Sequence, residues 1–155
     1  MLNKLRERMG REEGFTLVEL LVVMLILGIL AAIAIPSFFN QRDKARDADA
    51  KASVKTAQTA METFATDNGG TYLHVGGAQD GQSPTAANLQ AIEPALNDAP
   101  GTITITSNAT TYSVTVASAN TPNTFTINKL ANGQTTQTCD VDGSDGCPTS
   151  GNWSG

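Results

Sequence analysis

The chain has 155 residues and a mass of 16.2 kDa, and 40% of its residues are hydrophobic whereas only 5% are aromatic. This length provides one domain with a core of modest size. Fifteen acidic residues against ten basic ones give a net charge of -5. Most of such a molecule would repel DNA or RNA, so nucleic acid is not an expected partner.

Residues 15–35 form an apolar run with one charged member, Glu19. As a helix this run would reach about 32 Å, which matches the ~30 Å hydrocarbon thickness of a bilayer. The apolar region of a signal peptide is shorter, about 7–15 residues, and is followed by a cleavage site. The rest of the chain is polar and has too little apolar surface to bury such a helix on all sides. We therefore expect the run to span a membrane.

The residues around Glu19 resemble the processing motif of type IV prepilins and the related pseudopilins. Gly14 ends a short hydrophilic leader, Phe15 follows it, and the apolar run continues through Gly28 and Pro36. The resemblance implies that a prepilin peptidase cuts between Gly14 and Phe15. It also implies that the same enzyme methylates the new N-terminal amine of Phe15.

The resemblance divides the chain into a cleaved leader (1–14), a transmembrane and filament-core helix (15–39) and a globular domain (40–155). The leader has four basic residues, and another four lie between Arg42 and Lys51. The charges on the two sides therefore do not decide the orientation. The resemblance places the leader and the peptidase on the cytoplasmic side, and the globular domain in the periplasm or outside the cell.

Glu19 is costly inside a spanning helix, by about 2.5–3.5 kcal/mol on insertion scales, so it needs a partner. We expect its carboxylate to neutralise the amine of Phe15 on an adjacent subunit during filament assembly. The alternative is that Glu19 reaches back to the N-terminus of its own helix, where the helix dipole favours an anion.

Two further positions of the run affect the helix itself. Pro36 lacks an amide hydrogen and crowds the carbonyl four residues earlier, so we expect a bend near Ala32. The resemblance implies that the stretch from Gly28 to Pro36 can lose helical order when subunits pack into a fibre. The alternative is that membrane helices simply tolerate Gly and Pro.

Helical periodicity continues beyond the run to Asp67, with one apolar face formed by Ala50, Val54, Ala57, Met61 and Phe64. This pattern predicts a single helix of about 50 residues, half in lipid and half against a sheet. Asn68-Gly69-Gly70 is a typical end for such a helix.

The helix from Arg42 to Lys55 carries five basic and three acidic residues. It is either a solvated face with pairs such as Asp47 with Lys51, or a basic collar that meets lipid headgroups before assembly and neighbouring subunits after it.

The region after the helix predicts a short helix, begun by Ser83-Pro84 and extending from Ala86 to Ile92 or Leu96. Alternating apolar residues in 102–106, 112–116 and 124–127 then predict three strands of an antiparallel meander. The expected fold class is α+β, with the long N-terminal helix packed on a small sheet.

Cys139 and Cys147 lie close together in an exported, polar and turn-rich C-terminal stretch, so we expect a disulfide loop. A zinc site would need four ligands, and there are only two thiols and a distant histidine.

The loop contains three acidic residues, Asp140, Asp142 and Asp145, which are weak candidates for calcium binding. They do not fit the helix-loop-helix calcium pattern, because Asp145 stands where a Gly is needed and Gly151 where a Glu is needed. We expect no metal and no cofactor.

No His stands near a Ser or Cys nucleophile, and no Gly-rich loop links a strand to a helix, so we do not expect an enzyme. The resemblance implies a structural subunit of a type IV pilus-like filament, and we favour a major pilin over a type II secretion pseudopilin. A membrane-anchored binding domain that never polymerises is a further alternative. A pilin would be a single-pass precursor in the inner membrane, with lipid, the peptidase and an assembly platform as partners, and then part of an extracellular homopolymer.

Overall fold

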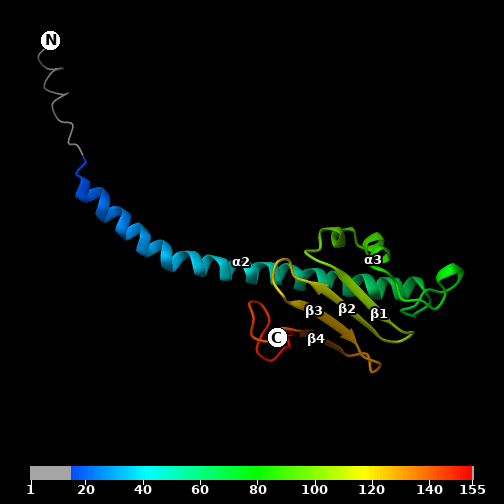
Figure 1. Cartoon of the computed structure of the whole chain (residues 1–155). Helices are drawn as coiled ribbons and strands as arrows, with labels where there is room; N and C mark the ends of the chain where they lie inside the picture. The colour runs from blue at the N-terminus through cyan, green and yellow to red at the C-terminus, as the bar shows by residue number, and fades with distance from the viewer. Residues whose placement is uncertain (1–14, 155) are drawn as a thin grey trace, which may run out of the picture. The chain divides into compact units, whose positions relative to one another are not determined.

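The computed structural model describes residues 15–154 and divides the chain into two compact units, Met1–Phe39 and Asn40–Gly155. One long helix, α2 (Leu17–Asp67), supplies the described residues of the first unit apart from its first two residues (Figure 1). The second unit contains the rest of α2 and all other elements. The predicted single helix of about 50 residues is confirmed, with 51 residues.

The part of α2 in the second unit packs one face against a sheet (Figure 1). All five residues of the predicted apolar face, Ala50, Val54, Ala57, Met61 and Phe64, are buried. Several of these positions are alanines, which allow a helix to approach its partner closely. The helix ends where the Gly70 amide donates to the Ala65 carbonyl at 2.7 Å, with Gly70 at a φ of 88°.

The sheet has four antiparallel strands in the order β1 (Ile103–Ser107), β2 (Tyr112–Ala117), β3 (Thr124–Lys129) and β4 (Thr135–Cys139). Side chains alternate between its two faces. The face toward α2 supplies the centre of the core through the fully buried residues Val114, Val116, Phe125 and Ile127.

The fourth strand corrects the sequence-based prediction of three. Thr135 to Thr138 has no apolar alternation, and only Cys139 at its end is buried. Pairing with β3 forms this strand, from Phe125 opposite Cys139 to Lys129 opposite Thr135. Hydrophobic periodicity does not detect an edge strand of this kind, because the side chains of the strand contribute little to the core.

The outer edge of β4 is covered by the C-terminal segment. The Cys139 amide donates to the Gly151 carbonyl at 2.9 Å, and the Trp153 amide donates to the Gln137 carbonyl at 3.1 Å. Thr138 and Asn152 form an antiparallel bridge between them. The last residues of the chain therefore continue the sheet by one short, irregular piece.

The connection between α2 and the sheet contains two short 3₁₀ helices, η1 (Gly77–Gln79) and η2 (Pro94–Asp98), and the helix α3 (Ala86–Ile92). Thr85 caps α3 in a reciprocal capping box with Asn88, one residue after the predicted Ser83-Pro84 start. The α-helix ends before Pro94. Leu96 is buried as well, but it belongs to the separate 3₁₀ helix η2. The predicted α+β class is therefore confirmed in its main elements.

The expected disulfide between Cys139 and Cys147 is present. The loop that it closes lies against α2 at Asp47, where the Gly146 amide donates to the Asp47 carboxylate at 2.8 Å. A Cβ atom on Gly146 would stand 2.6 Å from the Asp47 Cβ, so only glycine allows this approach.

Asp47 is fully buried and joins three parts of the domain. Besides the Gly146 amide, its carboxylate accepts hydrogen bonds from Thr121 Oγ1 at 2.7 Å and from Asn123 Nδ2 at 2.5 Å. Burial alone would raise the pKa of Asp47, but the nearby Ser118 hydroxyl and these three donors outweigh burial and hold the pKa below its ordinary value. The expected surface pair of Asp47 with Lys51 is replaced by this internal anchor, and Lys51 Nζ donates to the Gly146 carbonyl.

We predict that Asp47→Asn lowers the free energy of unfolding by about 2–4 kcal/mol, because a carboxamide cannot accept from all three donors. Because the folded pKa of Asp47 is depressed, its stabilisation is complete above the ordinary pKa of about 3.9 and is lost as pH falls through the folded value. Thermal unfolding of the detergent-solubilised chain from pH 7 to pH 2 measures both effects. The exposed Asp49→Asn is the matched control, and equal unfolding midpoints for the two variants would contradict the prediction.

Candidate functional site

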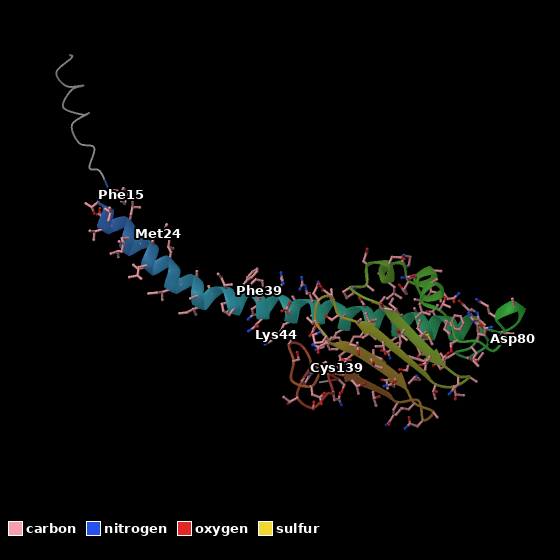
Figure 2. The ribbon with its side chains drawn as sticks, viewed as in Figure 1. Phe15, Met24, Phe39, Lys44, Asp80 and Cys139 are labelled. Carbon is pink, nitrogen blue, oxygen red and sulfur yellow. A yellow bond between two sulfur atoms is a disulfide. The ribbon has the colours of Figure 1, made fainter. Side chains whose placement is uncertain are left out.

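The N-terminal part of α2 exposes apolar side chains on every side. Every residue from 17 to 39 is exposed. Side chains such as those of Phe15, Met24 and Phe39 project from the ribbon, and Phe15 is 80% exposed (Figure 2). By length and composition this is the one described helix able to cross a membrane. Exposure of such a surface to water is unfavourable, so lipid or other protein must cover it.

The first turn of α2 is closed by a reciprocal pair of hydrogen bonds between Thr16 and Glu19. Glu19 Oε2 accepts from the Thr16 amide at 2.9 Å and from Thr16 Oγ1 at 2.8 Å. In return, the Glu19 amide donates to Thr16 Oγ1 at 3.2 Å. This is a capping box, and it satisfies amides that the helix itself leaves unpaired.

The capping box uses only one carboxylate oxygen of Glu19. Within residues 15–154 the other oxygen, Oε1, accepts no hydrogen bond. The carboxylate can therefore keep its own helix capped and still accept a cation from outside the chain. The expected alternative, in which Glu19 reaches back to its own N-terminus, and the expected pairing with another subunit are compatible in this geometry.

The other predicted positions of this segment lie in simple surroundings. Phe15 immediately precedes the capping box, whereas Gly14 and the leader lie outside the described residues. Gly28 and Pro36 both lie inside α2, which is helical at both positions. A Cβ atom on Gly28 would meet nothing within 4 Å, so this position has room for a close neighbour.

The acidic residues of the disulfide loop are engaged separately. Asp140 Oδ1 accepts the Thr124 amide at 2.6 Å, and Asp145 Oδ2 accepts from Ser144 Oγ at 3.1 Å. Asp142 lies against Gly151. In the part of the chain that the structure describes, no three His, Cys, Asp or Glu side chains are grouped as metal ligands.

Much of the expected basic collar is occupied within its own domain. Arg46 pairs with Asp43 at 3.1 Å, and Arg42 lies 3.9 Å from the same carboxylate. Lys51 and Lys55 stand over the Trp153 ring at 5.8 Å and 5.6 Å from its centroid. These lysines thus help to hold the C-terminal segment against α2.

A second carboxylate, that of the half-buried Glu62, anchors the distal half of α2 to the sheet. Glu62 Oε2 accepts from the Tyr72 hydroxyl at 2.8 Å, and Oε1 accepts from the Tyr112 hydroxyl at 3.1 Å and from Lys129 Nζ at 3.3 Å. The two tyrosine rings meet edge to face at 4.8 Å. We call Glu62, Tyr72, Tyr112 and Lys129 the tyrosine anchor.

The tyrosine anchor shifts the acidity of its members. Burial, and then the hydrogen bond and negative charge of Glu62, raise the pKa of Tyr72 to about 12. Burial and Glu62 raise the pKa of Tyr112 as well. Burial alone would raise the pKa of Glu62, but the two hydroxyls and Lys129 outweigh it and lower the pKa.

Asp47 and Glu62 are functional contacts that the sequence pattern alone does not predict. Asp47 lies three residues before Ala50, in phase with the apolar face of α2, and this phase was a signal that it is buried. Glu62 carried no comparable signal, because its three partners come from 10 to 67 residues away along the chain.

Two family models together match most of the chain. Residues 9–35 match the prokaryotic N-terminal methylation motif. Residues 36–149 match the family described as "Type IV minor pilin ComP, DNA uptake sequence receptor". No solved structure matches the chain.

Several curated relatives match part of the chain. The chain is 46% identical over 54 residues to the type IV major pilin protein PilA of Myxococcus xanthus, covering 35% of this chain and 24% of the relative. It is 40% identical over 58 residues to the type II secretion system core protein G of Pseudomonas aeruginosa, covering 37% and 41%. It is 36% identical over 98 residues to the prepilin peptidase-dependent protein D of Escherichia coli, covering 63% and 65%. The chain thus spans less than two thirds of each of these relatives. The expectation of a major pilin agrees with the name of the Myxococcus relative and differs from that of the family model.

We predict that the folded chain shows little phenolate absorbance below pH 11, although an ordinary tyrosine with a pKa of about 10 is largely ionised there. Tyr72 and Tyr112 are the only tyrosines, so a spectrophotometric titration reports on the tyrosine anchor alone. Glu62→Gln should bring the titration toward ordinary values, because it removes the negative charge beside both hydroxyls. Glu93→Gln is the control and should leave the titration unchanged. Titration of the wild-type folded chain near pH 10 would show that the anchor is not formed.

Proposed function

The chain belongs to the type IV pilin family, and from this premise we propose that it is a structural subunit of a type IV pilus-like filament. In this proposal residues 1–14 are a leader, residues 15–39 form the membrane-spanning and filament-core helix, and residues 40–155 form the exported domain. The subunit polymerises through its apolar helix after processing by a prepilin peptidase.

The observation that carries the proposal is the contrast between the two parts of α2. Between Asn40 and Asp67 the helix buries an apolar face against its own domain, whereas residues 17–39 bury none of their apolar side chains. This surface requires lipid in the precursor and other copies of the same helix after export. A bundle of such helices would bury it without any further partner.

A type II secretion pseudopilin is the first alternative, because the chain is 40% identical over 58 residues to a protein of that name. The match to the Pseudomonas core protein G covers only 37% of the chain, whereas the pilin family model covers residues 36–149. The globular domain therefore favours a pilus subunit. A membrane-anchored domain that never polymerises would leave the processing motif from Gly14 to Glu19 without a use.

The proposed partners follow from the proposed path of the subunit from the inner membrane to the filament. The precursor inserts into the inner membrane with lipid around residues 15–39, and an assembly platform transfers the processed subunit into an extracellular homopolymer. The matched family is described as a DNA uptake sequence receptor. Residues 40–155 hold eleven acidic and six basic residues, so we propose no nucleic-acid role for this chain.

We further propose that Glu19 Oε1 accepts the Phe15 amine of a neighbouring subunit during assembly. Cleavage would create a positive charge at the edge of an apolar helix, where an unpaired charge is costly. Oε2 would keep the capping box with Thr16 while the free oxygen makes the contact between subunits. Pairing would also fix the axial register, since a slip of one helical turn, about 5.4 Å, would separate the two groups.

We predict that protein purified from surface fibres begins at an N-methylated Phe15, and that Gly14→Arg blocks the cut. The reason is that the junction has a small residue before the cut and a large apolar one after it. Mass spectrometry of the intact protein and of its N-terminal peptide measures the start of the chain. Fibre protein that begins at Met1, or at any residue other than Phe15, would contradict the family-based processing.

We predict that Glu19→Gln and Glu19→Ala both leave the precursor inserted and cleaved, and that both reduce the number of fibres at least tenfold. A glutamine at this position can still form the capping box with Thr16, but it has no charge to neutralise an amine. Electron microscopy of sheared fibres from strains without a wild-type copy gives the numbers.

The two variants separate the two roles of Glu19. Loss of fibres only in Glu19→Ala would mean that Glu19 acts as a helix cap and not as the partner of a second subunit. Normal fibres from both variants would also refute the pairing. Immunoblots of the precursor and the processed chain confirm that each variant is made and cleaved.

A further inference from the structure

The sheet face that turns away from α2 carries an ordered array of uncharged polar side chains. Residues that alternate with the buried ones line up across all four strands through the register of the sheet. The first row is Thr104, Thr115, Thr126 and Thr138. The second row is Thr106, Ser113, Asn128 and Thr136. We call these eight residues the hydroxyl face.

The array is continuous. Thr115 Oγ1 and Thr126 Oγ1 are hydrogen-bonded at 2.8 Å in the first row, and Asn128 Nδ2 donates to Thr136 Oγ1 at 3.5 Å in the second. Neighbouring side chains within a row stand about 4.7–4.9 Å apart, and the two rows are about 6.6–6.8 Å apart along the strands. The residues on β1 and β4 are exposed, and those on β2 and β3 are half-buried.

The composition of the hydroxyl face is unusual for a solvent-facing sheet. Threonine suits a strand, which accounts for any one of these positions. Edge strands, however, commonly carry charged residues that prevent pairing with other chains, and neither β1 nor β4 places a charge on this face. All charged residues of a domain with eleven acids and six bases lie elsewhere.

One end of the hydroxyl face is hollowed. The second row, together with the β1–β2 and β3–β4 turns, lines a depression of about 470 Å³, which lies in the usual range for small-molecule sites of ~300–1,000 Å³. Lys129 also lines it, but its ammonium group is held by Glu62. The rest of the lining consists of residues with hydroxyl and amide side chains and the apolar residues Leu130 and Ala131, whereas Tyr112 turns its side chain toward Glu62 on α2.

This chemistry selects a class of ligand. Hydroxyl and amide groups both donate and accept hydrogen bonds, as the hydroxyls of a sugar do, and threonine methyl groups offer apolar contact to the C–H faces of a sugar ring. An anionic polymer would find one cation at the hollow, Lys129, whose charge Glu62 already neutralises, and it would be repelled by the acidic domain. A flat aromatic ligand would find no exposed ring to stack on.

We propose that the hydroxyl face and its hollow bind a neutral oligosaccharide or polysaccharide. The inference rests on the proposed function in one respect: in a filament every subunit repeats the face, so weak single contacts add up to strong adhesion. The site itself belongs to one chain and is complete within residues 104–138.

The test uses the full chain solubilised in a detergent without sugar headgroups, such as an alkylphosphocholine. Ligand-observed NMR with cellohexaose, chitohexaose and maltohexaose measures binding, and heparin is the anionic comparison. We expect binding of at least one neutral oligosaccharide and none of heparin. Thr106→Val with Thr136→Val removes two hydroxyls from the hollow and keeps the β-branched shape, and it should weaken binding at least about fivefold.

The matched control is Thr63→Val with Thr66→Val, which removes two exposed hydroxyls from α2 and should leave binding unchanged. Circular dichroism and thermal unfolding verify that both double variants fold. No binding of any neutral oligosaccharide, equal binding by both double variants, or preference for heparin would overturn the proposal. Binding by the solubilised chain but not by fibres would also overturn it, because the face would then be an interface between copies.

These results are independent of the filament proposal. The Glu19→Gln chain, expected not to assemble, should bind the oligosaccharide as the wild type does. The Thr106→Val, Thr136→Val chain should still form fibres. Loss of oligosaccharide binding would therefore count against the binding proposal alone, and loss of fibres against the filament proposal alone.

Discussion

An apolar helix surface that no described part of the chain buries is the constraint on which the rest of the molecule depends. Residues 17–39 of α2 expose their apolar side chains on all sides. This half of the helix therefore buries its apolar surface only in lipid or among other helices. The other half of the same helix buries its apolar face within the domain, because a sheet covers that face. A single secondary structure element thus serves two environments, and the change between them falls at the boundary of the two compact units near Phe39.

Polar contacts determine how the sheet meets the helix. Asp47 and Glu62 lie about four turns apart on α2, and each accepts hydrogen bonds from at least two other segments of the chain. Small alanines between them allow close packing but specify the register poorly, since an apolar surface of this kind could slide. Two carboxylates with fixed donors, one fully buried and one half-buried, remove that freedom, because a slipped register would leave the Asp47 charge buried and unpaired.

The sequence was sufficient for features that repeat with a period. The apolar run, the face from Ala50 to Phe64 and the alternation in β1 to β3 all place side chains in the core at regular intervals, and hydrophobic periodicity detects that. It was insufficient where the chain is held by its backbone or by distant partners. The strand β4 forms through pairing with β3, and the Glu62 site joins α2 to Tyr72, Tyr112 and Lys129. Contacts of this kind depend on tertiary structure, which a local pattern does not contain.

The C-terminal segment on the outer edge of β4 has a consequence for the proposed assembly of many copies into one filament. A free edge strand rich in threonine is a template for another strand, and copies held side by side would be prone to cross-β aggregation. The pairing of Gly151 to Trp153 with Gln137 to Cys139 occupies hydrogen-bonding groups in the second half of that edge, and the Cys139–Cys147 bond keeps the segment close. On the opposite edge, the Ser83 hydroxyl occupies both backbone groups of Ser107. These contacts occupy part of each sheet edge and so disfavour strand-to-strand growth, whereas the apolar helix surface remains open for the proposed polymerisation.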